Sequence, residues 1–191
     1  PNVQLKAKAW NESSLHSLIN CEVDMGIACR EWDERSPEHV ESIPDELNYI
    51  ELTREHSMCL VSEDHPALKQ HWDLNTFLQY RHIQVLFGGS ERWLLDDVLA
   101  IKRLERDIAI SMPDFHSAMS LCEQSELILC APAHHVAKMA SNFRLRILEL
   151  PIKLEPGAYV LLWHKHFEQD HGHKWLRNLI IHSNPMTNKT N

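Results

Sequence analysis

The chain has 191 residues, of which 43% are hydrophobic and 24% charged, an ordinary composition for a globular protein. Its formal net charge of −8 at pH 7 would repel the phosphate backbone of DNA. Apolar runs such as Tyr159 to Trp163 are too short to span a bilayer, and Pro1 to Trp10 lacks the pattern of a signal peptide. These properties argue against a membrane protein and against direct DNA contact, and they favour a small molecule or another protein as partner.

The cysteines indicate a reducing compartment. There are five of them, scattered along the chain, so they cannot all pair in a disulfide framework. Most lie within apolar runs, where a free thiol behaves as a small buried side chain. We therefore expect a cytoplasmic protein.

The first third of the chain predicts a βαβ unit. Polar and apolar residues alternate from Val3 to Ala9, which is typical of a half-buried strand. Residues 11–22 predict a helix with Ser13 or Ser14 as its N-cap, and 24–29 a short buried strand. Such a unit implies parallel pairing through a right-handed crossover. Beyond a polar loop at 30–48, the sequence predicts strands at 49–53 and 58–61. A short helix is predicted at 75–80, with Asp73 or Asn75 as its N-cap.

A second alternating run begins at Ile83 and fixes the fold class as α/β. After the Pro156–Gly157 turn comes a last buried strand and a closing helix, whose Trp175, Leu176, Leu179 and Ile180 are expected to face inward. The predicted strands of this part are 83–87, 107–111, 127–130, 144–150 and 159–163, and its helices are 91–104, one following Asp114, 134–140 and 173–182.

Five short strings, in order and suitably spaced, resemble the effector-binding domain of LysR-type transcriptional regulators. Each string is too short to be specific by itself, but together they extend the resemblance over essentially the whole chain. They are Glu22 to Ile27, Asp64 to Leu68, Ser125 to Pro132, Leu148 to Pro151, and Trp163–His164 followed by Trp175 to Arg177.

The resemblance implies two Rossmann-like α/β lobes joined by two crossing segments, as in type 2 periplasmic binding proteins. Lobe one would comprise residues 1–80 and 158–191, and lobe two 81–157. Family members carry a winged helix-turn-helix DNA-binding domain, and a further strand and helix of lobe one, before the position of Val3; neither is expected in this sequence. The implied function is that of a bacterial regulator, a homodimer or tetramer, that senses a small-molecule effector between its lobes and controls transcription. DNA would be bound only through the absent domain.

Ligands of open parallel sheets bind beyond the carboxyl ends of the strands, where helix N-termini expose unpaired N–H groups. This rule selects loops that the family's effector cleft also uses. The predicted effector-binding residues are Trp10, Asn11, Glu12, Ser13, Arg30, Gly88, Gly89, Ser90, Met112, Asp114, Phe115 and His116.

Each of these residues also has a structural interpretation. Ser90 would serve equally as an ordinary helix N-cap, and the aromatic side chains as core residues. Arg30 would pair with a carboxylate effector or remain solvated. Asp114 and Glu12 are explained by capping; if they face the cleft instead, they disfavour an anionic effector.

No sequence pattern supports an enzyme, a metal or a cofactor. The densest group of histidines, between His164 and His173, matches no standard ligand spacing, and there is no catalytic triad order, nucleophile elbow or phosphate loop. Two alternatives to a regulator stay open: the solute-binding protein of a transporter, which would need a secretion signal, and a thiol- or metal-dependent sensor. Cys29 beside Arg30 is the candidate reactive thiol.

Overall fold

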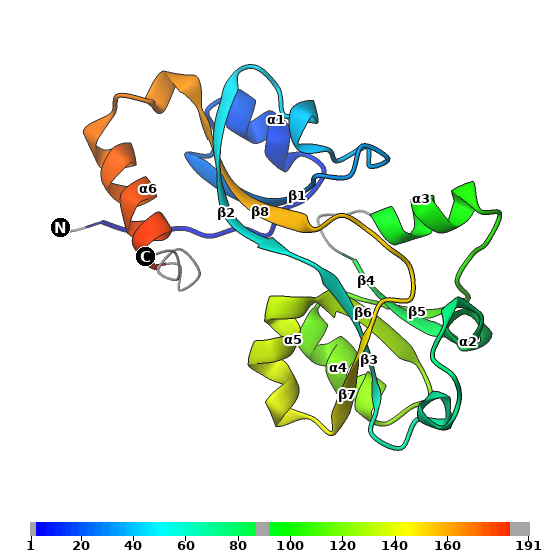
Figure 1. The fold of residues 1–191 in the computed structure, drawn as a ribbon. Coiled ribbons are helices and arrows are strands. Elements are labelled where there is room, and N and C mark those ends of the chain that lie inside the picture. Colours follow the sequence, from blue (N-terminus) through cyan, green and yellow to red (C-terminus); the bar gives the residue numbers. More distant parts are fainter. Residues whose placement is uncertain (1–2, 87–91, 184–191) are drawn as a thin grey trace, which may run out of the picture.

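The structure, a computed structural model, describes residues 3–86 and 92–183 and contains two β-sheets. The first sheet has the order β1 (Met25–Glu31), β8 (Gly157–His164), β2 (Leu47–Glu55), with both pairings antiparallel. The second has the order β5 (Ile108–Met112), β4 (His82–Val85), β6 (Ile128–Pro132), β3 (Ser57–Ser62), β7 (Leu145–Glu149). The chain passes between the sheets twice (Figure 1), so the predicted α/β class and two-part architecture are confirmed.

The helices form close to where the sequence places them. Two begin at predicted aspartate caps: Asp73 accepts a hydrogen bond from the Thr76 N–H, and Asp114 one from the Ser117 N–H. Each carboxylate thereby satisfies an N–H group that has no partner within its helix. The helices are α1 (Ser14–Ile19), α2 (Leu74–Gln79), α3 (Leu94–Ile101), α4 (Phe115–Glu123), α5 (Ala133–Met139) and α6 (His171–Ser183).

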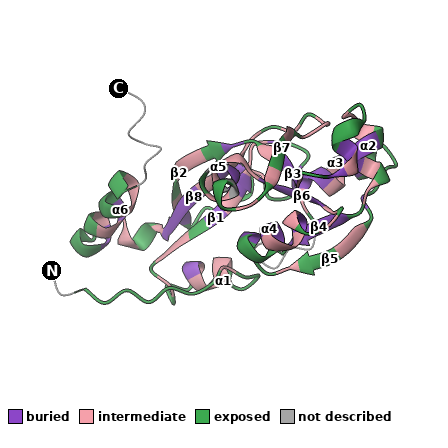
Figure 2. Ribbon diagram, turned by 90° about the horizontal axis from the view of Figure 1, so that it is seen from below, coloured by how far each residue is buried: buried purple, intermediate pink, exposed green. Residues whose placement is uncertain are grey.

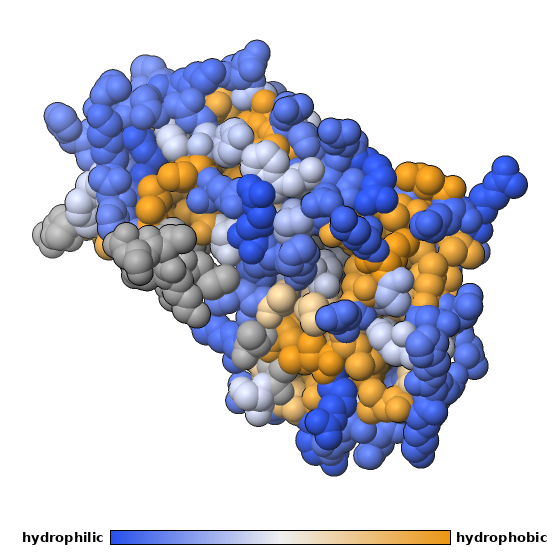
Figure 3. All heavy atoms as spheres, in the orientation of Figure 1, coloured by the Kyte–Doolittle hydropathy of each residue, from blue (hydrophilic) through white to orange (hydrophobic). Residues whose placement is uncertain are grey.

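The second sheet is buried on both faces. Leu60 of β3 packs in one apolar cluster with residues of α4, while its neighbours Cys59 and Val61 pack in another with residues of α2 and α3. Figure 2 shows the resulting run of buried residues along β3 and β6. The first sheet has a single smaller cluster beneath α1. Figure 3 shows mainly hydrophilic side chains over the first-sheet part and larger apolar areas over the second.

The predicted strand at 3–9 is not formed, and the parallel βαβ unit based on it is wrong. Residues 3–9 have no strand assignment, and Val3 and Leu5 are 52% and 67% exposed. β1 instead pairs antiparallel with β8. Alternation favours an extended backbone, but a strand also requires a neighbour to satisfy its hydrogen bonds, and no strand in the described ranges pairs with this segment.

The first crossing also differs from the prediction. The chain leaves the first sheet at His56, since β3 pairs with β6 and β7 of the second sheet. The prediction assigned residues 1–80 to lobe one, but from residue 57 the chain belongs to the second sheet. A single residue separates β2 from β3, so no turn signal in the sequence marks the change of sheet. The return crossing runs between β7 and β8.

Helix α6 buries two polar side chains, which the sequence did not predict. Of the four residues expected to face inward, Leu176 and Ile180 are partly buried, but Trp175 and Leu179 are 42% and 46% exposed. His173 and Arg177 are buried instead. The Arg177 guanidinium lies 4.7 Å from the centroid of the Trp163 ring and donates to two backbone carbonyls. A cation–π contact and satisfied donors thus replace the apolar packing. No helix in the described part of the chain combines the length and apolar character needed to cross a bilayer.

Candidate functional site

A cavity of about 320 Å³ lies between the two sheets, next to both crossings. A volume of this order suits a small organic ligand. The first sheet contributes Cys29, Glu31, Glu55, Gly157 and Tyr159 to its lining, and the second-sheet part contributes Ser57, Trp93, Leu94, Leu95, Phe115, Cys130 and Pro132. Both parts of the protein therefore form the site.

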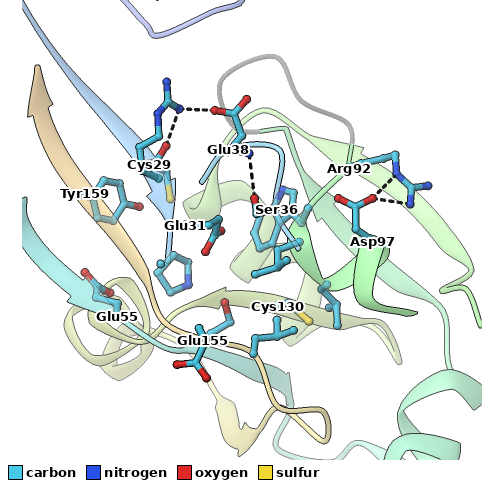
Figure 4. Close-up of a pocket in the computed structure, with 18 of the residues that line it drawn as sticks. Cys29, Glu31, Ser36, Glu38, Glu55, Arg92, Asp97, Cys130, Glu155 and Tyr159 are labelled. Atoms are coloured by element: carbon cyan, nitrogen blue, oxygen red, sulfur yellow. Dashed lines mark hydrogen bonds and ion pairs between the residues drawn. The ribbon is translucent and has the colours of Figure 1, made fainter. Parts of the chain in front are cut away.

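Two carboxylate side chains flank a glycine on the first-sheet wall. In the strand register Gly157 of β8 pairs with Glu31 of β1 on one side and with Glu55 of β2 on the other. Residues paired across a sheet point to the same face. Figure 4 shows Glu31 and Glu55 on opposite sides of β8. A Cβ atom on Gly157 would lie 3.1 Å from Glu31 Oε2, so the absence of a side chain there leaves room between the two carboxylates.

Burial and like charges perturb the acids of this wall. Burial, followed by repulsion from Asp33 and Glu38, raises the pKa of Glu31 from 4.5 to about 7. Burial also raises the pKa of Cys29 to about 12, and Glu31 adds to that effect. The pKa of Tyr159 is raised as well, mainly by burial. At Cys29, burial outweighs the opposing effect of the Arg30 charge.

Glu55 links the two parts of the protein. Its side chain is only 8% exposed, and its Oε2 accepts a 2.7 Å hydrogen bond from the backbone N–H of His134, at the start of α5. The neighbouring Ala133 N–H donates to the His56 carbonyl. The other carboxylate oxygen of Glu55, Oε1, is buried and has no hydrogen-bond partner in the described part of the chain. An unsatisfied buried oxygen of this kind is costly and uncommon in native proteins.

The two arginines of the lining are each ion-paired. Arg30 donates to Glu38, and Arg92 lies 2.9 Å from Asp97. Alternation along β1 sends Arg30 to the face opposite Glu31, where its register partner Ala158 belongs to the apolar core. Neither arginine therefore neutralises the carboxylates beside Gly157.

The second-sheet wall is apolar and firmly held. Trp93 donates from its indole Nε1 to the Val85 carbonyl at 3.1 Å, and its ring meets the Phe115 ring edge-on at 6.2 Å between centroids. The N-terminal turn of α3 is tied to the sheet by Arg106, which pairs with Asp96 at 2.8 Å and donates to Gln84. This wall provides shape and stacking surface rather than charge.

Of the predicted effector residues, the structure brings Trp10, Arg30 and Phe115 to the cavity. Exposed positions before α1 hold Asn11, Glu12 and Ser13, with Asn11 Oδ1 accepting from the Ser13 N–H. The remaining described residues are not among the lining: Met112 packs against the core, Asp114 caps α4 and His116 is exposed. Gly88, Gly89 and Ser90 lie outside the described residues.

The lining residues that sequence reasoning missed are chiefly Glu31, Glu55, Gly157, Tyr159 and Trp93. The rule of carboxyl strand ends could not select Gly157 and Tyr159, because β8 runs antiparallel to its neighbours and begins at Gly157. The glutamates could have been noticed in the sequence, because each ends a strand that also contains apolar residues. A carboxylate next to buried residues needs a hydrogen-bond donor or a positive charge.

The histidine group and Cys29 have local explanations. His164 Nδ1 accepts from the His166 N–H, and the buried His173 ring stacks on Phe167 at 4.4 Å. Within the described ranges, no three His, Cys, Asp or Glu side chains are grouped as metal ligands. A reactive thiol needs a lowered pKa, whereas burial raises that of Cys29, so the thiol-sensor alternative lacks its required chemistry at this residue.

A two-part α/β protein with a ligand-sized cavity at its crossings is of the type 2 periplasmic-binding-protein class. The family model for the LysR substrate binding domain matches residues 1–184. The chain therefore belongs to this family, the effector-binding domains of LysR-type transcriptional regulators.

Solved structures show the same fold. The probable transcriptional regulator PA0477 from Pseudomonas aeruginosa superposes with a TM-score of 0.76 at 22% identity; the match covers 87% of this chain and 53% of that protein's chain. The regulatory domain of MexT, a transcriptional activator in Pseudomonas aeruginosa, gives 0.71 at 17%, covering 91% and 81%. The effector-binding domain of QuiR in complex with shikimate gives 0.69 at 17%, covering 92% and 78%.

Proposed function

We propose that the cavity between the two sheets binds the small-molecule effector of a LysR-type regulator, and that its occupancy controls transcription. The observation that carries this proposal is that residues of both sheets line one cavity beside both crossings. A ligand touching both parts has different contacts at different angles between them, so its binding shifts the equilibrium toward one arrangement. The small molecule in the QuiR domain supports a ligand of this kind.

The finer features of the proposal follow from this role. We infer that the two lobes are the two sheets with their helices, with the first crossing at His56. The protein would act as a cytoplasmic homodimer or tetramer without catalytic activity. Contact with DNA would be made by the winged helix-turn-helix domain that the family resemblance implies, since the net charge of −8 disfavours DNA binding by these residues.

The test blocks the cavity with a bulky residue. Ser57→Phe adds a ring at the start of β3, where Ser57 lines the cavity, while Ser62→Phe adds the same ring at the far end of that strand, outside the lining. A metabolite library is screened by thermal unfolding for compounds that raise the midpoint, because a ligand stabilises the state it binds. We expect Ser57→Phe to abolish the stabilisation by each hit and Ser62→Phe to retain it. Equal stabilisation of both variants would place the ligand elsewhere and contradict the proposal.

A further inference from the structure

We infer that the effector of this cavity is a small organic cation, an ammonium or amidinium group on an apolar body, and that the cationic group binds over Gly157 between Glu31 and Glu55. The inference rests on the proposed function, because it names the ligand class of the same cavity. It is drawn from the charge, the satisfied and unsatisfied polar atoms and the shape of the lining.

The first support is the balance of charge. Five carboxylate residues line the cavity against two arginines: Glu31, Glu38, Glu55, Asp97 and Glu155 against Arg30 and Arg92. Both arginines are already engaged by Glu38 and Asp97. Among the described residues, Glu31 and Glu55 are in no ion pair, so both carboxyl groups remain available to a cationic ligand.

The second support is the unsatisfied oxygen of Glu55. The residue lines the cavity and is more than nine-tenths buried. Its Oε2 is held by the His134 N–H, whereas Oε1 has no hydrogen-bond partner among the residues that the structure describes. A carboxylate oxygen only accepts hydrogen bonds. Its missing partner is therefore a donor, and the strongest donors to a carboxylate are cationic N–H groups.

The third support is space at the right place. Gly157 lies between the two glutamates in the strand register, and it has no side chain to occupy the gap between them. Opposite this gap, Trp93, Leu95 and Phe115 form an apolar wall. A cation with a ring-sized body would place its charge at the carboxylates and its apolar part against that wall, where aromatic faces also attract cations.

One observation favours an anion instead, and it is weaker. Within the described ranges, the Nε atom of Arg30 is buried and has no hydrogen-bond partner. Its guanidinium is nevertheless paired with Glu38, and its side chain leaves β1 on the face opposite Glu31. An anionic ligand over Gly157 would meet two glutamates, and both arginines of the described lining are already paired with carboxylates. Binding of an anion is therefore an outcome of the test rather than the proposal.

The test compares three probes with the same ring: benzylamine, benzyl alcohol and benzoate. Each is titrated against this chain, with binding followed by tryptophan fluorescence, since Trp10 and Trp93 line the cavity. We expect benzylamine to bind more tightly than benzyl alcohol by about tenfold, and benzoate to bind most weakly. Tighter binding of benzoate than of benzylamine, or no binding of any probe at millimolar concentration, would overturn the inference.

Variants locate the cationic group. Glu55→Gln removes one charge but keeps the shape, and it should abolish the preference for benzylamine over benzyl alcohol. Glu41→Gln removes the same charge from an exposed position outside the lining and should leave the preference intact. Gly157→Ala, which places a methyl group 3.1 Å from Glu31 Oε2, provides a second route if Glu55→Gln does not fold. An unchanged preference in the folded variants would contradict the proposed position.

The same probes separate this inference from the proposed function. If benzoate or benzyl alcohol binds best and Ser57→Phe prevents its binding, the cavity is the ligand site but the cation inference is wrong. If Ser57→Phe has no effect on any probe that binds, both are wrong.

Discussion

The two walls of the cavity differ in chemistry and in support. The first-sheet wall carries Glu31, Glu55 and Tyr159 on a three-stranded antiparallel sheet with one apolar cluster. The second-sheet wall carries Trp93, Leu95 and Phe115 and rests on a five-stranded sheet that is buried on both faces. One wall thus supplies charge and the other supplies shape. The buried carboxylates of Glu31 and Glu55 lie at strand ends next to the crossings, where they do not interrupt a continuous apolar core.

The largest expected effect is loss of stability when the apolar wall is truncated. Leu95 is 2% exposed and belongs to the cluster between α3 and the second sheet. Leu95→Ala should lower the free energy of unfolding by about 2–5 kcal/mol, because it removes buried methyl groups and leaves a cavity. Urea denaturation measures the change.

The control for this substitution lies on the same helix. Ile101 is 67% exposed, so Ile101→Ala should change the free energy of unfolding by less than about 0.5 kcal/mol. Equal effects of the two substitutions would mean that α3 does not pack as the structure shows, and that the apolar wall is not rigid.

The first-sheet wall should make the free energy of unfolding depend on pH. Burial, followed by the carboxylates of Asp33 and Glu38, raises the pKa of Glu31 from 4.5 in the unfolded chain to about 7 in the fold. The other titratable groups near Glu31 are Cys29 on the same strand, and Tyr159 and Glu55 on the neighbouring strands. Between these pH values the folded state binds more protons than the unfolded state. Stability is therefore lost as pH rises from 4.5 through 7, by at most about 3 kcal/mol.

Glu31→Gln provides the reference for that measurement. The free energy of unfolding of the unmodified chain, relative to this variant, should be constant below pH 4.5, fall up to about pH 7 and then level off. The opposite contribution of His173, whose pKa is lowered by burial, is common to both proteins and cancels. A difference independent of pH would show that Glu31 is not in the charged, buried surroundings described.

The smallest effect concerns cysteine reactivity. Cys21 is exposed, whereas burial and Glu31 raise the pKa of Cys29 to about 12. Because the thiolate is the reactive species, iodoacetamide should modify Cys21 first and leave Cys29 largely unmodified in the native chain. Peptide mass mapping measures this, with the urea-unfolded chain, where both react, as control. Faster modification of Cys29 than of Cys21 would support the thiol-sensor alternative and contradict the burial of Cys29 in the first-sheet wall.

Much of the secondary structure was predictable because its signals are local. The Asp73 and Asp114 caps, and the alternation of strands and helices from residue 83 to 163, follow from neighbouring residues. Of the predicted effector-binding residues, Trp10, Arg30 and Phe115 line the cavity. That any of the predicted residues contacts a ligand stays a prediction. Inward and outward faces were less predictable: α6 buries Arg177 because a tryptophan and two carbonyls are available to it.

The sequence by itself determined the α/β class and the family, since periodicity, caps and short strings are properties of adjacent residues. Only the tertiary structure decided which sheet each strand joins and which side chains meet. Glu31, Gly157 and Glu55 form one row because β8 inserts between two strands more than 100 residues earlier in the chain. No local pattern encodes that register, and the carboxylate-lined side of the cavity depends on it.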